Sequence, residues 1–288
     1  MDEHVPLSRF TTIGTGGAAR WLARPESVDE LQEVLGWAAD RELAVEPIGL
    51  GSNVLPHDDG VEAVVVKLGG DLASVRADGA LISAGGGASN AVCLHRARDA
   101  GLSGFEFASA IPGTTGGGVR MNAGAYGREF RDVLVDAVIV DARGARTVTA
   151  EELELRYRHS NLRSGQVVAA VRLRLEASTP DAVRTLTAEL LAARKATQPT
   201  NRRTFGSVFK NPNGSPGAGR MIEECGLKGR AVGAAMISPR HANFIENAGG
   251  ASSLDCLALM AEARQRVFER FGYELEHEVQ FLGPLELP

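Results

Sequence analysis

The chain has 288 residues, enough for two domains with separate cores, and its hydrophobic and charged fractions, 44% and 23%, are those of a globular protein. A formal net charge of −5 argues against nucleic-acid and anionic-membrane partners, which need a strong excess of Lys and Arg, but it leaves room for a local anion pocket. Three scattered cysteines, no signal-peptide pattern and no long apolar run predict a cytoplasmic protein without a metal site or a membrane span.

The N-terminal part of the chain is predicted to mix helices and strands, with glycines at their junctions. Ser27 and Glu30 have the spacing of a capping box, and the apolar residues that follow at helical spacing predict a helix over 27–40. Ser89 favours the start of a second helix that ends at Gly101. Apolar runs predict three strands in this part, at 45–49, 61–68 and 81–84.

The rest of the chain is also predicted to contain both strands and helices. Strands are predicted at 133–141, 147–149 and 167–175. Helices are predicted from Thr179 onward, at 218–225 and at 254–271, and the last two are each followed by a glycine. The polar, proline-containing segment 195–203 lies between the helix that begins at Thr179 and the helix predicted at 218–225. We therefore place a domain boundary at this segment.

The 34 glycines concentrate at 49–51, 85–87 and 113–127. Glycine permits positive φ and has no Cβ, so consecutive backbone N–H groups can point together at an oxyanion. Thr114 and Thr115 add hydroxyl donors to the third cluster. A single cluster would be an ordinary turn, but several of them predict a backbone-lined site for a pyrophosphate. Neither GxGxxG in a βαβ unit nor GxxxxGK[ST] is present, so the predicted architecture is not that of a Rossmann fold or a P-loop.

Several polar segments join the glycine clusters in one ordered series. Each segment alone is compatible with an ordinary turn or an exposed strand, and only the series is specific. Its members are Thr11-Thr12 with Gly16-Gly17, Gly51-Ser52-Asn53, Ile111-Pro112-Gly113, residues 122–127, Tyr157-Arg158-His159-Ser160, residues 206–212, residues 241–245 and residues 275–279. The series resembles the UDP-N-acetylenolpyruvoylglucosamine reductase family from about Leu7 to Gly283, in its shorter branch, which lacks an extra tyrosine loop.

The resemblance implies an α+β fold with two domains. Residues 1–180 would form an FAD-binding domain of the vanillyl-alcohol-oxidase type, with subdomains at about 1–70 and 71–180. Residues 195–283 would form an α+β substrate-binding domain.

The implied activity is NADPH-dependent reduction of UDP-N-acetylglucosamine enolpyruvate to UDP-N-acetylmuramate, a step in peptidoglycan precursor synthesis. Non-covalent FAD would be the cofactor, NADPH the hydride donor and the UDP-sugar the small-molecule partner. The oligomeric state stays open, with a monomer as one possibility. Two other functions also remain open: a flavin oxidase or dehydrogenase with the same FAD fold, and a paralogue that has a diverged substrate or only binds its ligand.

The resemblance also implies individual roles. Arg158, Ser207 and Glu278 would be catalytic, with Ser207 as the proton donor. Contacts with FAD would come from Gly49, Gly51, Ser52, Asn53, Pro112, Gly113, Thr114, Thr115, Gly117, Gly118, Asn122, Gly124 and Tyr126. Contacts with the substrate would come from Lys210, Asn211 and His241. One departure is Ala110, which stands where the family usually has glycine.

Overall fold

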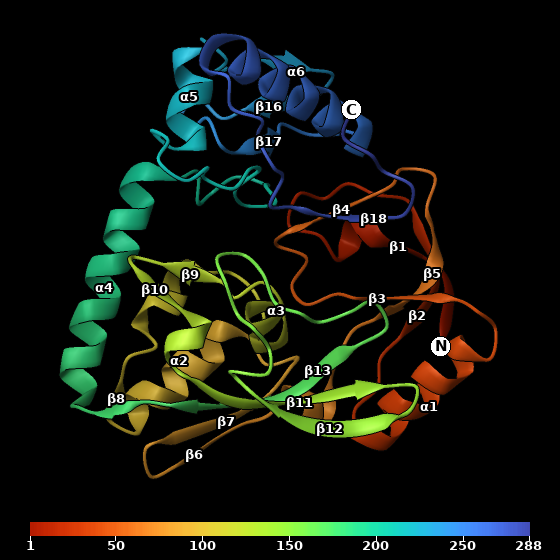
Figure 1. Cartoon of the computed structure of the whole chain (residues 1–288), viewed down its shortest axis with the longest axis vertical. Helices are drawn as coiled ribbons and strands as arrows, with labels where there is room; N and C mark the ends of the chain where they lie inside the picture. The colour runs from red at the N-terminus through yellow and green to blue at the C-terminus, as the bar shows by residue number, and fades with distance from the viewer. The chain divides into compact units, whose positions relative to one another are not determined.

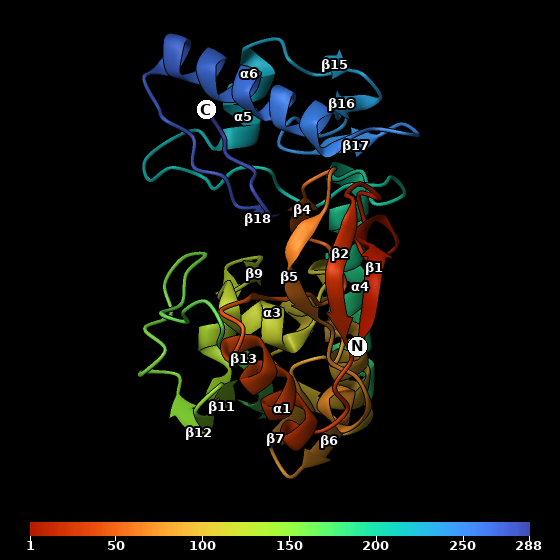
Figure 2. The ribbon, with the colours of Figure 1, turned by 90° about the vertical axis from the view of Figure 1, so that its right-hand side faces the viewer.

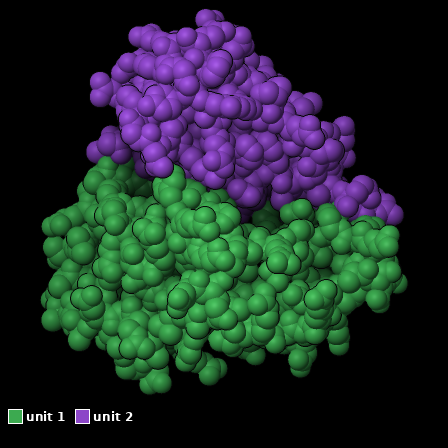
Figure 3. Space-filling view, viewed as in Figure 1, with its two compact units in different colours: residues 1–2, 21–50, 63–194 green, residues 3–20, 51–62, 195–288 purple.

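The computed structural model describes residues 1–288 and divides the chain into two compact units. Unit 1 consists of residues 1–2, 21–50 and 63–194, and unit 2 of residues 3–20, 51–62 and 195–288, shown in green and purple in Figure 3. Each unit is therefore assembled from separate stretches of sequence. The domain bounds predicted from the sequence, 1–180 and 195–283, remain a proposal.

Helices and strands are both present along the whole chain (Figure 1). The helices are α1 (Val28–Ala39), α2 (Asn90–Asp99), α3 (Thr115–Arg120), α4 (Pro180–Thr197), α5 (Ala218–Glu224) and α6 (Ser253–Phe271). All but α3 confirm helices predicted from the sequence. None of them has the length and apolar composition that a membrane span requires.

The strands form several small sheets and one larger one. Their bounds are β1 (Asp2–Pro6), β2 (Ala18–Ala23), β3 (Ala44–Pro47), β4 (Val54–Pro56), β5 (Val61–Val66), β6 (Val75–Asp78), β7 (Leu81–Gly85), β8 (Leu102–Ser103), β9 (Gly124–Ala125), β10 (Arg128–Glu129), β11 (Leu134–Asp141), β12 (Gly144–Thr149), β13 (Val167–Arg174), β14 (Glu176–Ala177), β15 (Ala231–Val232), β16 (Ala235–Ile237), β17 (Ile245–Asn247) and β18 (Gln280–Leu282). Strands β1 and β2 were not predicted from the sequence.

A five-stranded antiparallel sheet in the order β12-β11-β13-β7-β6 organises unit 1. Alternate residues of its strands belong to different cores, as expected when both faces are covered. Ile139 of β11 packs in the cluster that includes Cys93 of α2. The next residue, Val140, packs in the cluster that includes Leu31 and Leu35 of α1. The two helices therefore cover opposite faces of the sheet.

Helix α1 begins as the sequence predicts, with one difference in its cap. The Ser27 hydroxyl accepts a hydrogen bond from the backbone N–H of Glu30 at 3.2 Å. The carboxylate of Glu30, however, accepts from the N–H of Glu26 at 2.8 Å instead of from that of Ser27. The Ser27 bond satisfies an N–H group of the first turn, as a cap does, and the Glu30 bond holds the residue that precedes the cap.

Unit 2 is built around the antiparallel sheet β15-β16-β17, against which α6 packs with α5 beside it (Figure 2). Cys256, Leu259, Met260, Ala263 and Val267 form the buried stripe of α6. Their spacing of three or four residues is that of one helix face, so the sequence pattern accounts for the packing.

A parallel pair of short strands, β4 and β18, joins distant parts of unit 2. Val54 of β4 pairs with Gln280 of β18. The glycine-containing segment 51–53 therefore lies directly beside the end of the 275–279 motif, although more than two hundred residues separate them in the chain.

The thiol of Cys93 is buried in a core of unit 1, and that of Cys256 is buried in the core of unit 2. Burial raises the pKa of each thiol to about 12. A thiol with so high a pKa holds almost no reactive thiolate at neutral pH. Both therefore behave as small apolar groups.

Gly36 offers a test of the assignment of α1. A Cβ at this position would have no atom within 4 Å, and alanine has a higher helix propensity than glycine. We expect Gly36→Ala to raise the free energy of unfolding of unit 1 by about 0.5–1 kcal/mol, as measured by urea denaturation. Gly118→Ala should instead be destabilising, because the new Cβ would overlap the ring of Phe130. Equal effects of the two changes would contradict the open space at Gly36 and the contact of Gly118 with Phe130.

Candidate functional site

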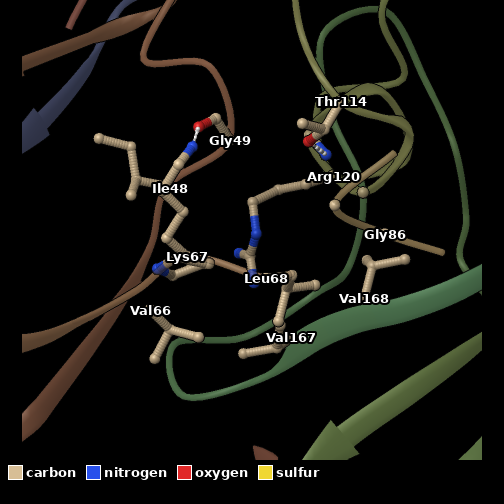
Figure 4. A pocket seen from close by; sticks show the side chains of 14 residues that line it. Ile48, Gly49, Val66, Lys67, Leu68, Gly86, Thr114, Arg120, Val167 and Val168 are labelled. Carbon is tan, nitrogen blue, oxygen red and sulfur yellow. Dashed lines mark hydrogen bonds between the residues drawn. The ribbon is translucent and has the colours of Figure 1, made fainter. Parts of the chain in front are cut away.

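The glycine clusters of unit 1 come together around a pocket. Gly49 follows β3, Gly86 and Gly87 follow β7, and Thr114 and Gly117 belong to the start of α3, and all five line the pocket (Figure 4). Thr114 is the N-cap of α3, and its Oγ1 accepts a hydrogen bond from the N–H of Gly117 at 3.4 Å. Its short first turn therefore faces the pocket with backbone groups and a hydroxyl.

Three backbone segments meet closely behind this pocket. A Cβ on Gly86 would overlap the carbonyl oxygen of Val168, and a Cβ on Gly116 would lie 2.8 Å from the carbonyl oxygen of Gly86. Two backbone hydrogen bonds close the junction: Gly86 N–H to Ala169 O at 2.7 Å, and Gly116 N–H to Gly86 O at 2.9 Å. These glycines are required by the packing of the protein itself.

Gly117 differs from its neighbours in this respect. A Cβ on Gly117 would meet only Thr114 Oγ1 within 4 Å, at an ordinary contact distance of 3.6 Å. The residue is exposed and lines the pocket. Nothing within the protein requires a glycine here, so its presence fits a ligand that approaches the backbone closely.

Two cationic side chains that the sequence analysis missed also line the pocket, Lys67 and Arg120 (Figure 4). Lys67 Nζ donates to Gly49 O at 2.7 Å, and the guanidinium of Arg120 donates to the carbonyl of Gln166. Burial lowers the pKa of Lys67 and that of Arg120, while Glu46 acts on Arg120 in the opposite direction. Neither cation has a carboxylate within ion-pair distance, so a bound anion would offset the desolvation of both.

The loop that carries Arg158 is tied to the end of α3. Arg158 has a left-handed backbone with φ of 53°, and its guanidinium donates to Gly124 O at 3.1 Å. The hydroxyl of Ser160 donates to Arg120 O at 2.6 Å. Asn122, which is fully buried, uses its amide to hold Arg156 O at 2.9 Å. Thus the predicted catalytic arginine is placed relative to the same helix that forms the pocket.

The predicted cofactor residues of unit 1 differ in where they lie. Gly49, Thr114 and Gly117 line the pocket. Thr115 and Gly118 are buried behind it, where the Thr115 hydroxyl donates to Gly85 O at 2.7 Å. Pro112, Gly113, Asn122, Gly124 and Tyr126 are not among the lining residues. The hydroxyl of Tyr126 donates to Leu190 O at 2.8 Å and so ties its own loop to α4.

In unit 2, the segment that carries Ser207 and Lys210 lies beside the segment that carries Glu278. The N–H of Glu278 donates to Val208 O at 2.8 Å, and the N–H of Lys210 donates to Glu276 O at 2.9 Å. The ammonium of Lys210 also forms an ion pair with the carboxylate of Glu276. Two predicted catalytic residues and one predicted substrate residue are therefore brought together, which no spacing in the sequence could have indicated.

The segment 51–53 lies next to the same place. The side-chain amide of Asn53 donates to the carbonyl of Glu278 at 3.2 Å, and the carbonyl of Asn53 accepts from Gln280 N–H at 2.9 Å. Gly51 is required for internal packing, because its φ is 65° and a Cβ would overlap the carbonyl oxygen of Phe10. The predicted role of Gly51, Ser52 and Asn53 in cofactor binding remains a prediction.

Asn211 and His241 lie in the same unit. Asn211 Oδ1 accepts from Ala218 N–H at 2.9 Å, and His241 Nδ1 accepts from Asn243 N–H at 3.2 Å. Burial, followed by the charge of Lys228, lowers the pKa of His241, which favours the neutral imidazole at neutral pH. His241 is therefore suited to exchange hydrogen bonds with a ligand and not to supply a positive charge.

Comparison with known proteins gives two family matches. Residues 19–150 match the family described as "FAD binding domain", and residues 198–282 match "UDP-N-acetylenolpyruvoylglucosamine reductase, C-terminal domain". The chain is 42% identical to the UDP-N-acetylenolpyruvoylglucosamine reductase of Novosphingobium aromaticivorans, over 98% of this chain and 95% of that protein. It is 44% identical to the reductase of the same name from Anaeromyxobacter dehalogenans, over 98% and 86%.

A solved structure agrees with these matches. The crystal structure of UDP-N-acetylenolpyruvylglucosamine reductase (MurB) from Thermus caldophilus has a TM-score of 0.86 and 38% identity to this chain, and the alignment covers 98% of both chains. The α+β fold class, with an FAD-binding domain followed by a C-terminal α+β domain, is thereby confirmed.

A substitution at Gly117 distinguishes an effect on protein stability from an effect on FAD binding. Gly117→Ala should leave the melting temperature of the FAD-free protein unchanged or higher, because alanine favours the helix and meets no clash. It should weaken FAD binding, because the new methyl occupies the pocket side of the backbone. Fluorescence titration of the FAD-free protein with FAD measures the affinity. Unchanged affinity would show that no ligand approaches Gly117 closely.

Arg120 tests the electrostatic part of the pocket. Arg120→Met should weaken FAD binding by about 10-fold or more, the usual scale for one charge-assisted hydrogen bond. Arg76→Met is a matched control, since it removes the same charge from an exposed position of β6. Equal losses in the two variants would mean that only the net charge matters and that Arg120 makes no contact with the cofactor.

Proposed function

The chain belongs to the UDP-N-acetylenolpyruvoylglucosamine reductase family, and we propose that it reduces UDP-N-acetylglucosamine enolpyruvate to UDP-N-acetylmuramate with NADPH as the hydride donor. The product is a precursor of peptidoglycan, so the enzyme would serve cell-wall synthesis in the cytoplasm. The observation that carries the proposal is the adjacency of the Ser207 segment and Glu278 in unit 2, where Glu278 N–H donates to Val208 O at 2.8 Å.

The pocket of unit 1 is proposed to hold the pyrophosphate part of non-covalent FAD. The open pocket side of Gly117 allows close approach, and the hydroxyl of Thr114 is a further donor. Lys67 and Arg120 would offset the negative charges of the pyrophosphate. When bound, FAD supplies the hydride carrier between NADPH and the enolpyruvyl substrate.

The protein's own side chains would then donate the proton to the substrate and stabilise the negative charge that develops on it. Ser207 is proposed to donate a proton to the carbon that bears the ether oxygen, as a positioned general acid. Negative charge develops toward the neighbouring carboxylate during this reduction, and Arg158 with Glu278 would stabilise it. The guanidinium is suited to this because it is permanently charged and planar, so it can bind a carboxylate with two parallel hydrogen bonds.

Lys210, Asn211 and His241 are proposed to bind the UDP-sugar. The ion pair of Lys210 with Glu276 supports this, because Glu276 is exposed and the ammonium can exchange it for a phosphate oxygen. The lowered pKa of His241 supports a role as a neutral hydrogen-bonding group.

The experiment that tests the proposal separates the two half-reactions by stopped-flow absorbance of the flavin. Ser207→Ala should reduce the flavin with NADPH at nearly the wild-type rate, because this step needs no proton donor at the substrate carbon. Reoxidation by the enolpyruvyl substrate should slow by roughly 10²-fold or more, the usual scale for losing a general acid.

Ser215→Ala is the matched control for this experiment. The hydroxyl of Ser215 donates to Pro212 O at 2.7 Å within its own turn, so its loss should leave both half-reactions near the wild-type rates. If Ser207→Ala slowed both steps equally, Ser207 would be a packing residue. If it slowed neither, the proton would come from another group and the assignment would be wrong.

A further inference from the structure

The segment that carries Ser207 and Lys210 has hydrogen-bonding partners on two sides. On one side, Val208 O and Lys210 N–H bond the backbone of Glu278 and Glu276. Phe209 pairs with His277 between these two bonds, as in an antiparallel ladder. Backbone groups along a strand alternate in direction, so the N–H and C=O of Phe209 point to the other side.

On that other side, one side chain takes the place of a neighbouring strand. Asn243 Oδ1 accepts from Phe209 N–H at 2.9 Å, and Asn243 Nδ2 donates to Phe209 O at 2.8 Å. The backbone carbonyl of Asn243 also accepts from Val208 N–H at 2.9 Å. Asn243 is 4% exposed and Phe209 is 2% exposed, so water does not compete for these groups.

We propose that Asn243 is a positioning residue of the reductase reaction, which holds Ser207 and Lys210 in place by clamping the backbone of Phe209 between them. The inference rests on the proposed function, because that function gives Ser207 and Lys210 their roles. The side chain of Asn243 bonds the peptide groups of Phe209 and acts on Ser207 and Lys210 through them.

The chemistry of the amide explains why asparagine suits this position. A primary amide offers one acceptor and two donors in a plane, and here it matches one N–H and one C=O of a single residue. Removing it would leave both groups of Phe209 buried without partners. The segment would then shift or fluctuate to reach other partners, and Ser207 and Lys210 would move with it.

Asn247 provides a matched control in the same unit. It is 8% exposed, and its amide holds Ile13 O at 2.9 Å, Gly249 N–H at 2.8 Å and Ala251 N–H at 3.1 Å. Its burial and number of hydrogen bonds are comparable with those of Asn243, but its partners lie outside the 207–210 segment.

The test compares Asn243→Ala with Asn247→Ala in the FAD-loaded enzyme. Both changes should lower the melting temperature. Only Asn243→Ala should accelerate amide hydrogen exchange in residues 207–210 and slow reoxidation of the reduced flavin by the enolpyruvyl substrate. We expect that slowing to be about 10-fold or more, because small misplacements of reacting groups can cost up to 10²-fold. Flavin reduction by NADPH should stay near the wild-type rate in both variants.

Asn243→Asp is a second variant that keeps the shape of the side chain. Its carboxylate can still accept from Phe209 N–H but cannot donate to Phe209 O while it is ionised. It should therefore slow the same half-reaction as Asn243→Ala, which keeps the inference testable if the alanine variant does not fold.

The outcomes separate this inference from the proposed function. If Ser207→Ala slows reoxidation and both Asn243 variants leave it at the wild-type rate, the positioning role is wrong and the proposed function stands. If Asn247→Ala slows reoxidation as much as Asn243→Ala does, the effect is general destabilisation and the inference is also wrong. If Ser207→Ala has no effect, the proposed function itself fails, whatever the Asn243 variants do.

Discussion

The close approach of backbone segments at Gly86 is the constraint on which the pocket of unit 1 depends. The turn after β7, the start of β13 and the start of α3 meet where a Cβ would overlap the carbonyl oxygen of Val168. Because the obstructing atoms belong to the backbone, no change of rotamer can relieve the clash. Glycine therefore allows the first turn of α3 to reach this position.

The consequences of this packing extend along α3 to the proposed catalytic machinery. The C-terminal end of the helix carries Arg120, whose carbonyl accepts from Ser160 in the Arg158 loop. A backbone junction that needs glycine thus fixes the position of Arg120 in the pocket. It also fixes the loop that carries Arg158, the arginine proposed to be catalytic. In unit 2, the buried side-chain amide of Asn243 holds the Ser207 segment in position through two hydrogen bonds to the backbone of Phe209.

Local signals predicted most of the helices, and non-local packing explains what they missed. Ser27 with its apolar stripe was sufficient for α1, because caps and periodicity act within a few residues. Helix α3 was not predicted, since three of its six residues are glycines, which disfavour helices. Its N-cap at Thr114 and its packing against β13 override that preference.

The candidate site was predicted in part, chiefly through resemblance to a family. Glycine clustering alone indicated an anion site, and Gly49, Thr114 and Gly117 do line one pocket. Lys67 and Arg120 were missed, because a single cation after an apolar strand or at the end of a short helix usually lies in solvent. The adjacency of Ser207 and Glu278 depends on pairing across about seventy residues, which no local pattern encodes.

The parallel pairing of β4 with β18 also constrains the order in which the molecule can form. Asn53 finds its partners in Glu278 and Gln280, which the ribosome adds only after nearly all the rest of this sequence. The segment 276–280 is likewise the partner of the Ser207 segment. The loops at 51–53 and 207–210 therefore cannot form these contacts until the same stretch of chain has been synthesised. Contacts of such long sequence separation close slowly, because the entropy of loop closure is lost before the contact is made. The proposed catalytic centre of unit 2 is therefore assembled late, and a nascent chain that stops short of residue 276 leaves the loops at 51–53 and 207–210 without their shared partner.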